Sequence, residues 1–428
     1  MTDKYADSGS LSEGGLKHFK TYKYSSVDLS PVSNYILKHY VRQTPPPLRN
    51  RYTPALTQTT QWNACVEFLP LWLAPNMVTL LGFLCIIANV ALLSLVDPSL
   101  TGPQHSWVYY SYGLGIWAYS TMDNIDGKQA RRTGTSSGLG ELFDHGIDSL
   151  NCTLASLLEV SAMGLGATKL GAFTALVPCL PMFFSTWETY HTHTLFLGYF
   201  NGPTEGLLIA SLITIASGYY GPQIWHTPVS LPVIGLEASA KDLWVYIVLA
   251  AFFVAHLPSC VINVAEARRR QGKPLAPLLL EWTPMLVFCG SLIAWLGSPY
   301  SSLIRNNHLC LLCLTLSFVF GRMTTKIILA HLTRQPFPYW TSLLLPLVGG
   351  ALLVNLPFFG LNPLSAEIEY YYLLSAFAIS LIVYFRWAFL VINAICDYLD
   401  IQCLTIPADK VQALQQQRRR AEKAKKTS

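Results

Sequence analysis

Charged residues are scarce in this chain, and their scarcity is the first informative feature of its sequence. Of its 428 residues, 12% are Asp, Glu, Lys or Arg and 52% are hydrophobic. A soluble domain carries roughly 25% charged residues, so the composition excludes an ordinary soluble protein. The sequence therefore indicates a membrane protein.

The sequence also lacks the cysteine pattern of a cross-linked or zinc-binding protein. Its ten cysteines are scattered, mostly within apolar runs. Such positions are typical of small core residues, so we expect neither a disulfide framework nor thiol redox chemistry. A cleavable leader is not expected either, because the first sixty or so residues are polar, charged and proline-bearing. We expect the first membrane span to act as its own anchor.

Long apolar runs dominate the rest of the sequence. A helix needs about 20 apolar residues to cross a bilayer, and runs of about this length recur about ten times, which predicts an all-α polytopic integral membrane protein. The predicted spans are Leu71–Val96, Trp107–Met122, Leu142–Leu165, Gly171–Trp187, Gly206–Tyr220, Leu243–Val264, Leu278–Trp295, Leu309–Leu329, Tyr339–Phe359 and Tyr371–Ile395.

Basic residues gather after the even-numbered spans, including Arg131 and Arg132, Arg268 to Arg270, and the C-terminal tail. By the positive-inside rule, both termini and the connection between spans two and three face the cytosol. We expect three regions: a cytosolic N-terminal segment at 1–60, a transmembrane catalytic domain at 61–406 and a basic cytosolic tail at 407–428. A short interfacial helix is possible between Val32 and Arg42, with an exposed linker as the alternative.

Four aspartates stand between the second and third spans. Asp123 and Asp126 are three residues apart, and Asp144 and Asp148 are four apart, so each pair shares one face of a helix. Carboxylates near hydrocarbon need a compensating cation. Oxygen ligands suit Mg²⁺ or Mn²⁺, and four carboxylates are enough for two ions about 4 Å apart. Two metal ions at this spacing commonly bind a diphosphate.

Neighbouring residues fit a phosphate-bearing ligand. Arg131 can form paired hydrogen bonds with a phosphate, and Gly127 and Gly140 leave room for a ligand at the backbone. A second polar cluster contains Glu188, His191, His193 and Glu205. Its two histidines are two residues apart and do not share a helical face, so pocket walls or interface residues are favoured over zinc ligands. Trp117, Tyr119, Trp187 and Tyr190 could surround a quaternary ammonium, or could form an ordinary aromatic belt.

The acidic stretch resembles the signature of the CDP-alcohol phosphotransferases, Asp-x-x-Asp-Gly-x-x-Ala-Arg followed after eight residues by Gly-x-x-x-Asp-x-x-x-Asp. All eight fixed positions are filled, by Asp123, Asp126, Gly127, Ala130, Arg131, Gly140, Asp144 and Asp148. The segments Gly140-Glu-Leu-Phe-Asp-His145, Pro75-Asn-Met-Val-Thr79 and Ser185-Thr-Trp-Glu-Thr-Tyr-His-Thr-His-Thr194 are similar to the choline and ethanolamine phosphotransferases, especially the fungal ones. The likeness runs from about Gly15 to about Pro407.

The resemblance implies transfer of phosphocholine or phosphoethanolamine from CDP-choline or CDP-ethanolamine to diacylglycerol, giving phosphatidylcholine or phosphatidylethanolamine and CMP. It implies that Asp123, Asp126 and Asp144 bind two Mg²⁺ ions, with Asp148 completing the site or serving as base. Implied substrate-binding residues are Asn76, Gly127, Ala130, Arg131 and Gly140. It also implies a homodimer in the endoplasmic reticulum or Golgi membrane, with lipid partners and an active site facing the cytosol. We expect no nucleic-acid partner.

The acceptor hydroxyl must lose a proton, and two bases are candidates. On a helix with 100° per residue, Glu141 and His145 border the stripe made by Asp144 and Asp148. We favour His145 as the base, with Glu141 orienting its ring and Asp148 as the rival. Two departures from the family pattern are Gly138, where proline is frequent and the loop is expected to be looser, and an apparent insertion at Gln43 to Gln61.

Other readings use similar residues. Inositol and serine branches share the aspartate signature, and only the segments around His145 and His191 argue against them. A prenyltransferase would have two aspartate motifs far apart in sequence. A transporter would show charges near the midplane of repeated halves, whereas these acids cluster once, at one membrane face.

Overall fold

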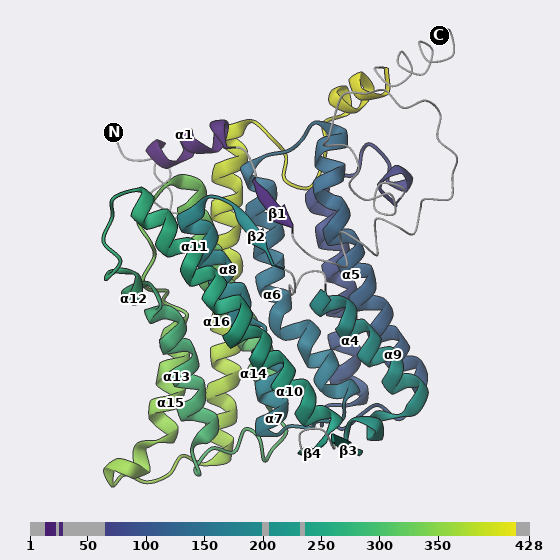
Figure 1. The fold of residues 1–428 in the computed structure, drawn as a ribbon, viewed down its shortest axis with the longest axis vertical. Helices are drawn as coiled ribbons and strands as arrows, with labels where there is room; N and C mark the ends of the chain where they lie inside the picture. The colour runs from purple at the N-terminus through teal and green to yellow at the C-terminus, as the bar shows by residue number, and fades with distance from the viewer. Residues whose placement is uncertain (1–12, 23–24, 29–64, 199–204, 232–235, 417–428) are drawn as a thin grey trace.

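The computed structural model describes residues 13–22, 25–28, 65–198, 205–231 and 236–416, which form a bundle of roughly parallel and antiparallel helices (Figure 1). The long helices are α4 (Pro75–Val96), α5 (Ser106–Thr133), α6 (Gly138–Ala162), α14 (Leu309–Thr333) and α16 (Ala366–Leu399). Shorter ones are α1 (Glu13–Thr21), α7 (Lys169–Leu176), α8 (Cys179–Thr192), α9 (Leu207–Tyr220), α12 (Leu278–Glu281), α13 (Thr283–Gly297) and α15 (Leu344–Val354). One continuous helix consists of α10 (Ala240–Ala250), the π-helical η5 (Ala251–His256) and α11 (Leu257–Arg270).

The predicted helical membrane architecture is confirmed. Each predicted apolar run coincides with one helix or with two or three consecutive helical elements. Within the described residues, five helices are long and apolar enough to cross a bilayer: α4, α7 with α8, α10 with α11, α14, and α16. Helices α5 and α6 are as long but carry the acidic residues, and α9, α13 and α15 are shorter. The number of ten spans therefore stays a prediction.

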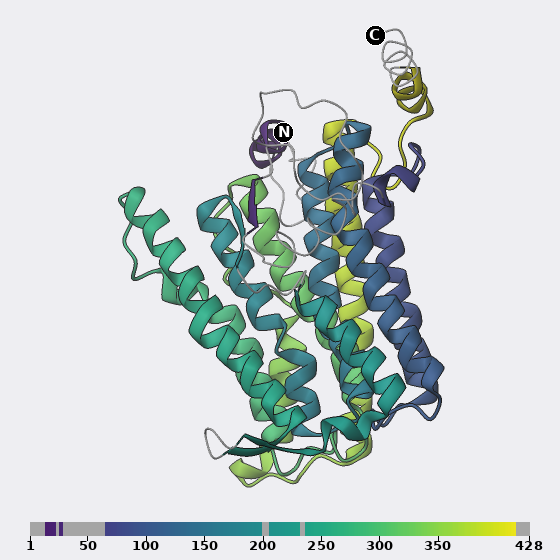
Figure 2. The same cartoon turned by 45° about the vertical axis from the view of Figure 1, so that its right-hand side comes forward.

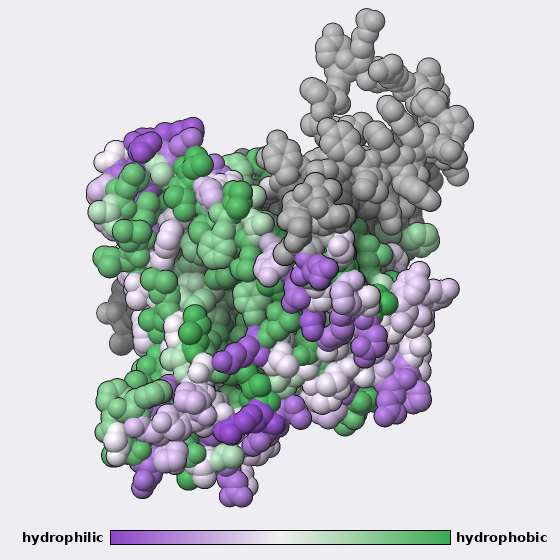
Figure 3. All heavy atoms as spheres, turned by 60° about the horizontal axis from the view of Figure 1, so that its bottom comes forward, coloured by the Kyte–Doolittle hydropathy of each residue, from purple (hydrophilic) through white to green (hydrophobic). Residues whose placement is uncertain are grey.

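Large apolar side chains cover the outside of the bundle. Val254 and Ile293 are 77% and 73% exposed, which would be costly in water and is expected in lipid. Apolar residues make up much of the surface seen in Figure 3, with hydrophilic residues gathered in patches. The chain is therefore an integral membrane protein.

Small and polar residues bring the central helices together. Ser111 on α5 donates to Asn89 on α4, and the Asn89 amide returns a bond to the Ser111 carbonyl. Ser211 on α9 donates to the carbonyl of Gly113, where a Cβ would lie 2.8 Å from Thr214. Helices in a membrane associate through close backbone packing and interhelical hydrogen bonds. The hydrophobic effect does not drive this association, because the surrounding lipid is as apolar as the side chains. These contacts fix α5 against both neighbours.

Helix α5 extends well beyond the predicted end at Met122. It continues to Thr133 and ends at Gly134, whose φ of 62° is the left-handed conformation that glycine favours. Only residues 134–137 separate it from α6, and the side chain of Ser137 caps α6 by accepting from the Gly140 amide. The acidic residues therefore lie on two packed helices instead of a loop.

The N-terminal helix α1 lies across one end of the bundle (Figure 1). Its Leu16 and Phe19 are buried against Leu139 of α6 and Leu332 of α14. It is followed by β1 (Ser26–Asp28), which pairs in parallel with β2 (Leu195–Leu197). A second strand pair, β3 (Pro228–Leu231) and β4 (Leu236–Ser239), closes the opposite end.

Gly138, one of the two departures from the family pattern, is a buried residue at the start of α6. A Cβ there would lie 2.9 Å from Cδ1 of Phe19, so the absent side chain makes room for α1. Gly138 is thus the first residue of α6, and the expected looser loop stays a prediction. The predicted interfacial helix and the Gln43 to Gln61 insertion lie outside the described residues.

The segment after α16 returns to the start of α4. Leu73 forms a bridge with Thr405, and Ile406 packs against Ala74. Residues 408–416 are helical and belong to the predicted basic tail, the rest of which lies outside the described residues. The described N-terminal and C-terminal segments thus meet the bundle at the same end, where α6 and α4 begin (Figure 1).

Candidate active site

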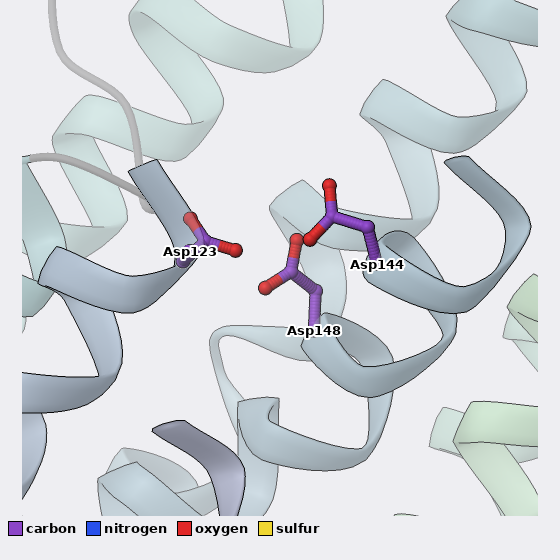
Figure 4. Close-up of side chains that lie close together, drawn as sticks. All are labelled: Asp123, Asp144 and Asp148. Carbon is purple, nitrogen blue, oxygen red and sulfur yellow. The ribbon is translucent and has the colours of Figure 1, made fainter. Parts of the chain in front are cut away.

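Three of the four predicted metal ligands come together between α5 and α6. Asp123 on α5 faces Asp144 and Asp148 on α6 (Figure 4). One carboxylate oxygen from each can be chosen so that all three lie within 4.8 Å of one another. The helical spacing of the sequence thus produces a compact set of carboxylate ligands from two packed helices.

Asp126, the fourth predicted ligand, lies beside this set and is held by a different contact. It is buried, and its Oδ2 accepts a hydrogen bond of 2.5 Å from Thr79 on α4. Its carboxyl is also within hydrogen-bonding reach of Asp144. Asp148 has a comparable support, because the buried Tyr119 hydroxyl donates to its Oδ1 at 2.5 Å. Thr79 and Tyr119 therefore fix the directions of two carboxylates.

Two oxygens of the set have no hydrogen-bond partner among the described residues. They are Oδ1 of Asp123 and Oδ1 of Asp144, and both are buried. An unpaired buried carboxylate oxygen is costly, and adjacent carboxylates repel one another. A hard divalent cation would satisfy these oxygens and relieve the repulsion. The donor set consists of carboxylates, with neither imidazole nor thiolate in it, and therefore fits Mg²⁺ or Mn²⁺ better than zinc.

The predicted phosphate-binding residues flank the carboxylates. Arg131 is exposed, and its Nη1 would lie 3.6 Å from a Cβ added at Gly127, so its guanidinium lies over this glycine. On the other helix, Asn76 Oδ1 would lie 3.7 Å from a Cβ at Gly140. The Asn76 amide donates to the carbonyl of Cys403 at 3.0 Å, so the C-terminal segment orients it. Each glycine leaves space beside a polar group that could contact a ligand.

Ala130 completes the predicted substrate-binding set and lies in the last turn of α5. Its carbonyl accepts from the amide of Thr135 at 2.9 Å, which closes the turn toward α6. Arg132, two residues after Ala130, donates to the carbonyls of Val66 and Leu69. The two adjacent arginines therefore differ, because Arg132 braces the chain before α4 and Arg131 is left beside the site.

His145 and Glu141, the predicted base and its orienting group, lie on α6 at the edge of the carboxylate set. Nε2 of His145 is 3.9 Å from Oδ2 of Asp144. Glu141 is buried, and its Oε2 has no hydrogen-bond partner among the described residues. Tyr22, just after α1, hydrogen bonds with the Glu141 carboxyl. Sequence reasoning missed Tyr22, because nothing in the local pattern shows that α1 packs on α6.

A cavity of about 270 Å³ opens beside these two residues. Glu141, His145 and Asp148 line one end, and its wall continues along α6, α8, α9 and η5 to Glu159 and Trp244. Most of the intervening side chains are apolar, including Ala155, Met182, Leu207, Ala210 and Phe252. The arrangement provides an apolar chamber within the bundle whose polar end is the candidate active site.

Three residues of the second polar cluster, Glu188, His191 and His193, contact different partners. Glu188 accepts from Asn263 at 2.5 Å, whereas His191 contacts Glu281 at 2.6 Å. His193 lies just beyond α8 and contacts His331 of α14. Burial, with Arg334, His191 and Lys273 nearby, lowers the pKa of His193.

The four candidate aromatic residues are also separated. Trp117 is 47% exposed on the outside of α5, and buried Trp187 donates to Glu281. Tyr190 donates to the carbonyl of Gln335. Tyr119 lines the chamber and is the member of this group that contacts a predicted ligand. The four residues therefore do not form one aromatic cage around a ligand.

Comparison with known proteins identifies the family. Residues 72–227, which contain both acidic helices, match the family described as CDP-alcohol phosphatidyltransferase. Choline/ethanolaminephosphotransferase 1 of Saccharomyces cerevisiae is 33% identical over 413 residues, covering 92% of this chain and 97% of the yeast protein. Choline/ethanolaminephosphotransferase 2 of Arabidopsis thaliana is 32% identical, covering 93% and 98%. Ethanolaminephosphotransferase 1 of Homo sapiens is 30% identical, covering 86% and 88%. The chain belongs to the CDP-alcohol phosphatidyltransferase family.

Proposed function

We propose that this chain transfers phosphocholine or phosphoethanolamine from its CDP carrier to diacylglycerol. The products are phosphatidylcholine or phosphatidylethanolamine, and CMP. The observation that carries the proposal is the junction of two features, a carboxylate set fit for divalent cations and an apolar chamber that ends at His145 and Asp148. Full-length relatives that bear the names of these activities support it.

The four carboxylates form the proposed binding site for the CDP-alcohol, the donor substrate. Asp123, Asp126, Asp144 and Asp148 are the proposed ligands of two Mg²⁺ ions, with Mn²⁺ as a substitute. When bound, the ions neutralise the diphosphate and stabilise the charge that develops as CMP leaves. Arg131 binds a phosphate oxygen beside Gly127, where no side chain obstructs it. Asn76 and Gly140 border the CDP on the α4 side, and Ala130 is the remaining residue of the proposed substrate-binding set.

The acceptor reaches the site through the chamber. Its acyl chains occupy the apolar wall, and its free hydroxyl lies next to His145 in line with the outer phosphorus. His145 takes the hydroxyl proton, and the neighbouring Glu141 carboxylate stabilises the resulting imidazolium. Asp148 is the weaker candidate for the base, because its Oδ1 already accepts from Tyr119 and its carboxylate belongs to the ligand set.

The membrane setting follows from charge. Arg131 and Arg132 end α5, and Arg268 to Arg270 end α11, at the same side of the bundle as α1 (Figure 1). The positive-inside rule then supports a cytosolic active site, which is where CDP-alcohols are available. We place the enzyme in the endoplasmic reticulum membrane, with the Golgi as the alternative, and we propose a homodimer on the strength of the family resemblance.

The test is product formation by the purified full chain in lipid nanodiscs containing diacylglycerol. The assay supplies Mg²⁺ with equal concentrations of CDP-choline and CDP-ethanolamine, and it identifies both phospholipids. Asp123→Asn should lose at least 100-fold in rate, whereas Asp397→Asn, an exposed aspartate on α16, should keep wild-type activity.

The competing donors settle the headgroup preference within the same experiment. Absence of product from both donors, with a protein that Mg²⁺ still stabilises against heat, would overturn the proposed substrate pair. CDP-diacylglycerol with inositol or serine would then be the next substrates to assay. A protein that Mg²⁺ does not stabilise and that forms no product would contradict the transferase mechanism itself, leaving transport as the rival.

A further inference from the structure

His331 is a second histidine in the wall of the chamber, at the same end as His145. It lies two residues before the end of α14 and is 5% exposed. The mechanism above gives it no task. A buried histidine beside a reaction site, without a structural partner for one of its nitrogens, requires an explanation.

The two ring nitrogens of His331 have different surroundings. Its Nδ1 lies 3.1 Å from Nδ1 of His193, within hydrogen-bonding distance. Its Nε2 is buried and has no partner among the described residues. A neutral imidazole has one N–H, so the contact has two tautomeric forms, and in the form where His193 Nδ1 donates, the proton of His331 lies on Nε2. In that tautomer Nε2 is a buried, unpaired hydrogen-bond donor on a residue that lines the cavity.

The ring of His331 is held in place from two sides. His193 stacks on it, with ring centroids 5.0 Å apart and an interplanar angle of 27°. Tyr22 approaches it edge-on, with centroids 5.9 Å apart and an angle of 90°. Tyr22 also hydrogen bonds with Glu141, the proposed partner of His145, so the Tyr22 side chain contacts His331 and the group beside His145. The direction of the unpaired donor is therefore fixed relative to the proposed base.

We propose that Nε2–H of His331 binds an ester carbonyl of the acceptor lipid and so positions its free hydroxyl at His145. The inference rests on the proposed function. A diacylglycerol offers one hydroxyl and two ester carbonyls, and the carbonyls accept hydrogen bonds without donating any. A donor that is buried, fixed and otherwise unpaired matches a carbonyl. The remainder of the acceptor is hydrocarbon, for which the chamber provides apolar walls.

The experiment compares two acceptors that differ at the proposed contact. Dioleoylglycerol has both ester carbonyls, and the corresponding dioleyl ether of glycerol has neither. The variants are His331→Phe, which keeps a ring of similar size without a donor, and His331→Gln, whose amide can place an N–H near Nε2. The KM for each acceptor and kcat are measured in nanodiscs at saturating CDP-alcohol.

Loss of one hydrogen bond should raise the KM for dioleoylglycerol about fivefold in His331→Phe. The KM for the ether lipid and the KM for the CDP-alcohol should stay within twofold of wild type, because these ligands make no contact with Nε2. His331→Gln should recover part of the loss. His193→Leu, which removes the partner of Nδ1, should raise the same KM by a smaller factor. His308→Phe, at the opposite end of α14, is the matched control and should leave all constants unchanged.

Three results would overturn the proposal. Equal KM increases for both acceptors would make His331 a structural residue, and unchanged constants would show that it makes no contact with the acceptor. A fall in kcat of about 100-fold with both acceptors would make Nε2 a proton acceptor, in the opposite tautomer. None of these results affects the proposed transferase activity, because each is measured against an active wild-type enzyme. Inactivity of the wild type toward dioleoylglycerol would instead refute the proposed function.

Discussion

Replacing Asp123 by asparagine should change the thermal stability of this protein in opposite directions with and without metal. The side chain faces two other carboxylates, with ligand oxygens within 4.8 Å, and at an effective dielectric constant of about 20 each such pair repels by about 3.5 kcal/mol. Proton uptake by the cluster relieves most of this repulsion, so we expect a net gain of about 1 kcal/mol in EDTA from removing one charge.

The opposing contributions are small for this residue. No Lys, Arg or His among the described residues forms a salt bridge with Asp123, and its Oδ1 has no hydrogen-bond partner there. Asparagine has nearly the same shape, so packing is preserved. In EDTA the melting temperature of Asp123→Asn should therefore not be below that of wild type. A gain of about 1 kcal/mol corresponds to a rise of roughly 2 °C.

Magnesium should reverse the order. A ligand at 100 times its Kd stabilises the folded protein by about 2.7 kcal/mol, and the variant should lose most of this gain together with its activity. The measurement is intrinsic tryptophan fluorescence during heating in nanodiscs, with and without Mg²⁺, with Asp397→Asn as control. A variant that melts below wild type in EDTA, or that keeps the full magnesium shift, would refute the reasoning.

Three further predictions concern the surroundings of the site. Gly138→Ala places a Cβ 2.9 Å from Cδ1 of Phe19, so α1 should be displaced at a cost of about 1–3 kcal/mol in stability. The displacement should be seen as faster proteolysis near the N-terminus and lower activity. Adding Phe19→Leu should restore both, and failure of this rescue would contradict the steric explanation. Ala210→Phe fills part of the chamber and should reduce the rate with dioleoylglycerol more than with dioctanoylglycerol, whereas equal losses would argue against acyl chains in this cavity. The pKa of His193 is lowered by burial and nearby cations, so the unfolded chain binds a proton there more readily than the folded protein does. Stability should therefore fall as pH drops below about 6.5, and His193→Asn should show a shallower decline in melting temperature between pH 7.5 and 5.5.

The sequence predicted the parts of the fold that depend on local periodicity. Each apolar run corresponds to helix, and the spacing of Asp123, Asp144 and Asp148 was enough to place them together, because α5 and α6 are joined by a four-residue turn. The second predicted span ended with its apolar run at Met122, and α5 continues to Thr133 with Asp123 and Asp126 on it, as their helical spacing predicted.

Contacts between distant segments could not be predicted. Tyr22 approaches His331 because α1 packs on α6 and α14, and no periodicity in residues 13–22 indicates this destination. The hydrogen bond from Thr79 to Asp126 and the contact between His193 and His331 also join residues on different helices. Such pairs depend on how helices rotate and cross, which is set by the whole bundle.

The helix formed by α10, η5 and α11 forms one wall of the chamber and lies at the outer side of the bundle in Figure 2. Only 11% of its most apolar stretch is buried within the chain, so lipid surrounds most of it. A wall supported mainly by lipid takes part of its position from the lateral pressure of the bilayer. Phosphatidylethanolamine and phosphatidylcholine differ in molecular shape and change that pressure in different ways. We therefore expect the width of the chamber to respond to the composition of the membrane that such an enzyme builds.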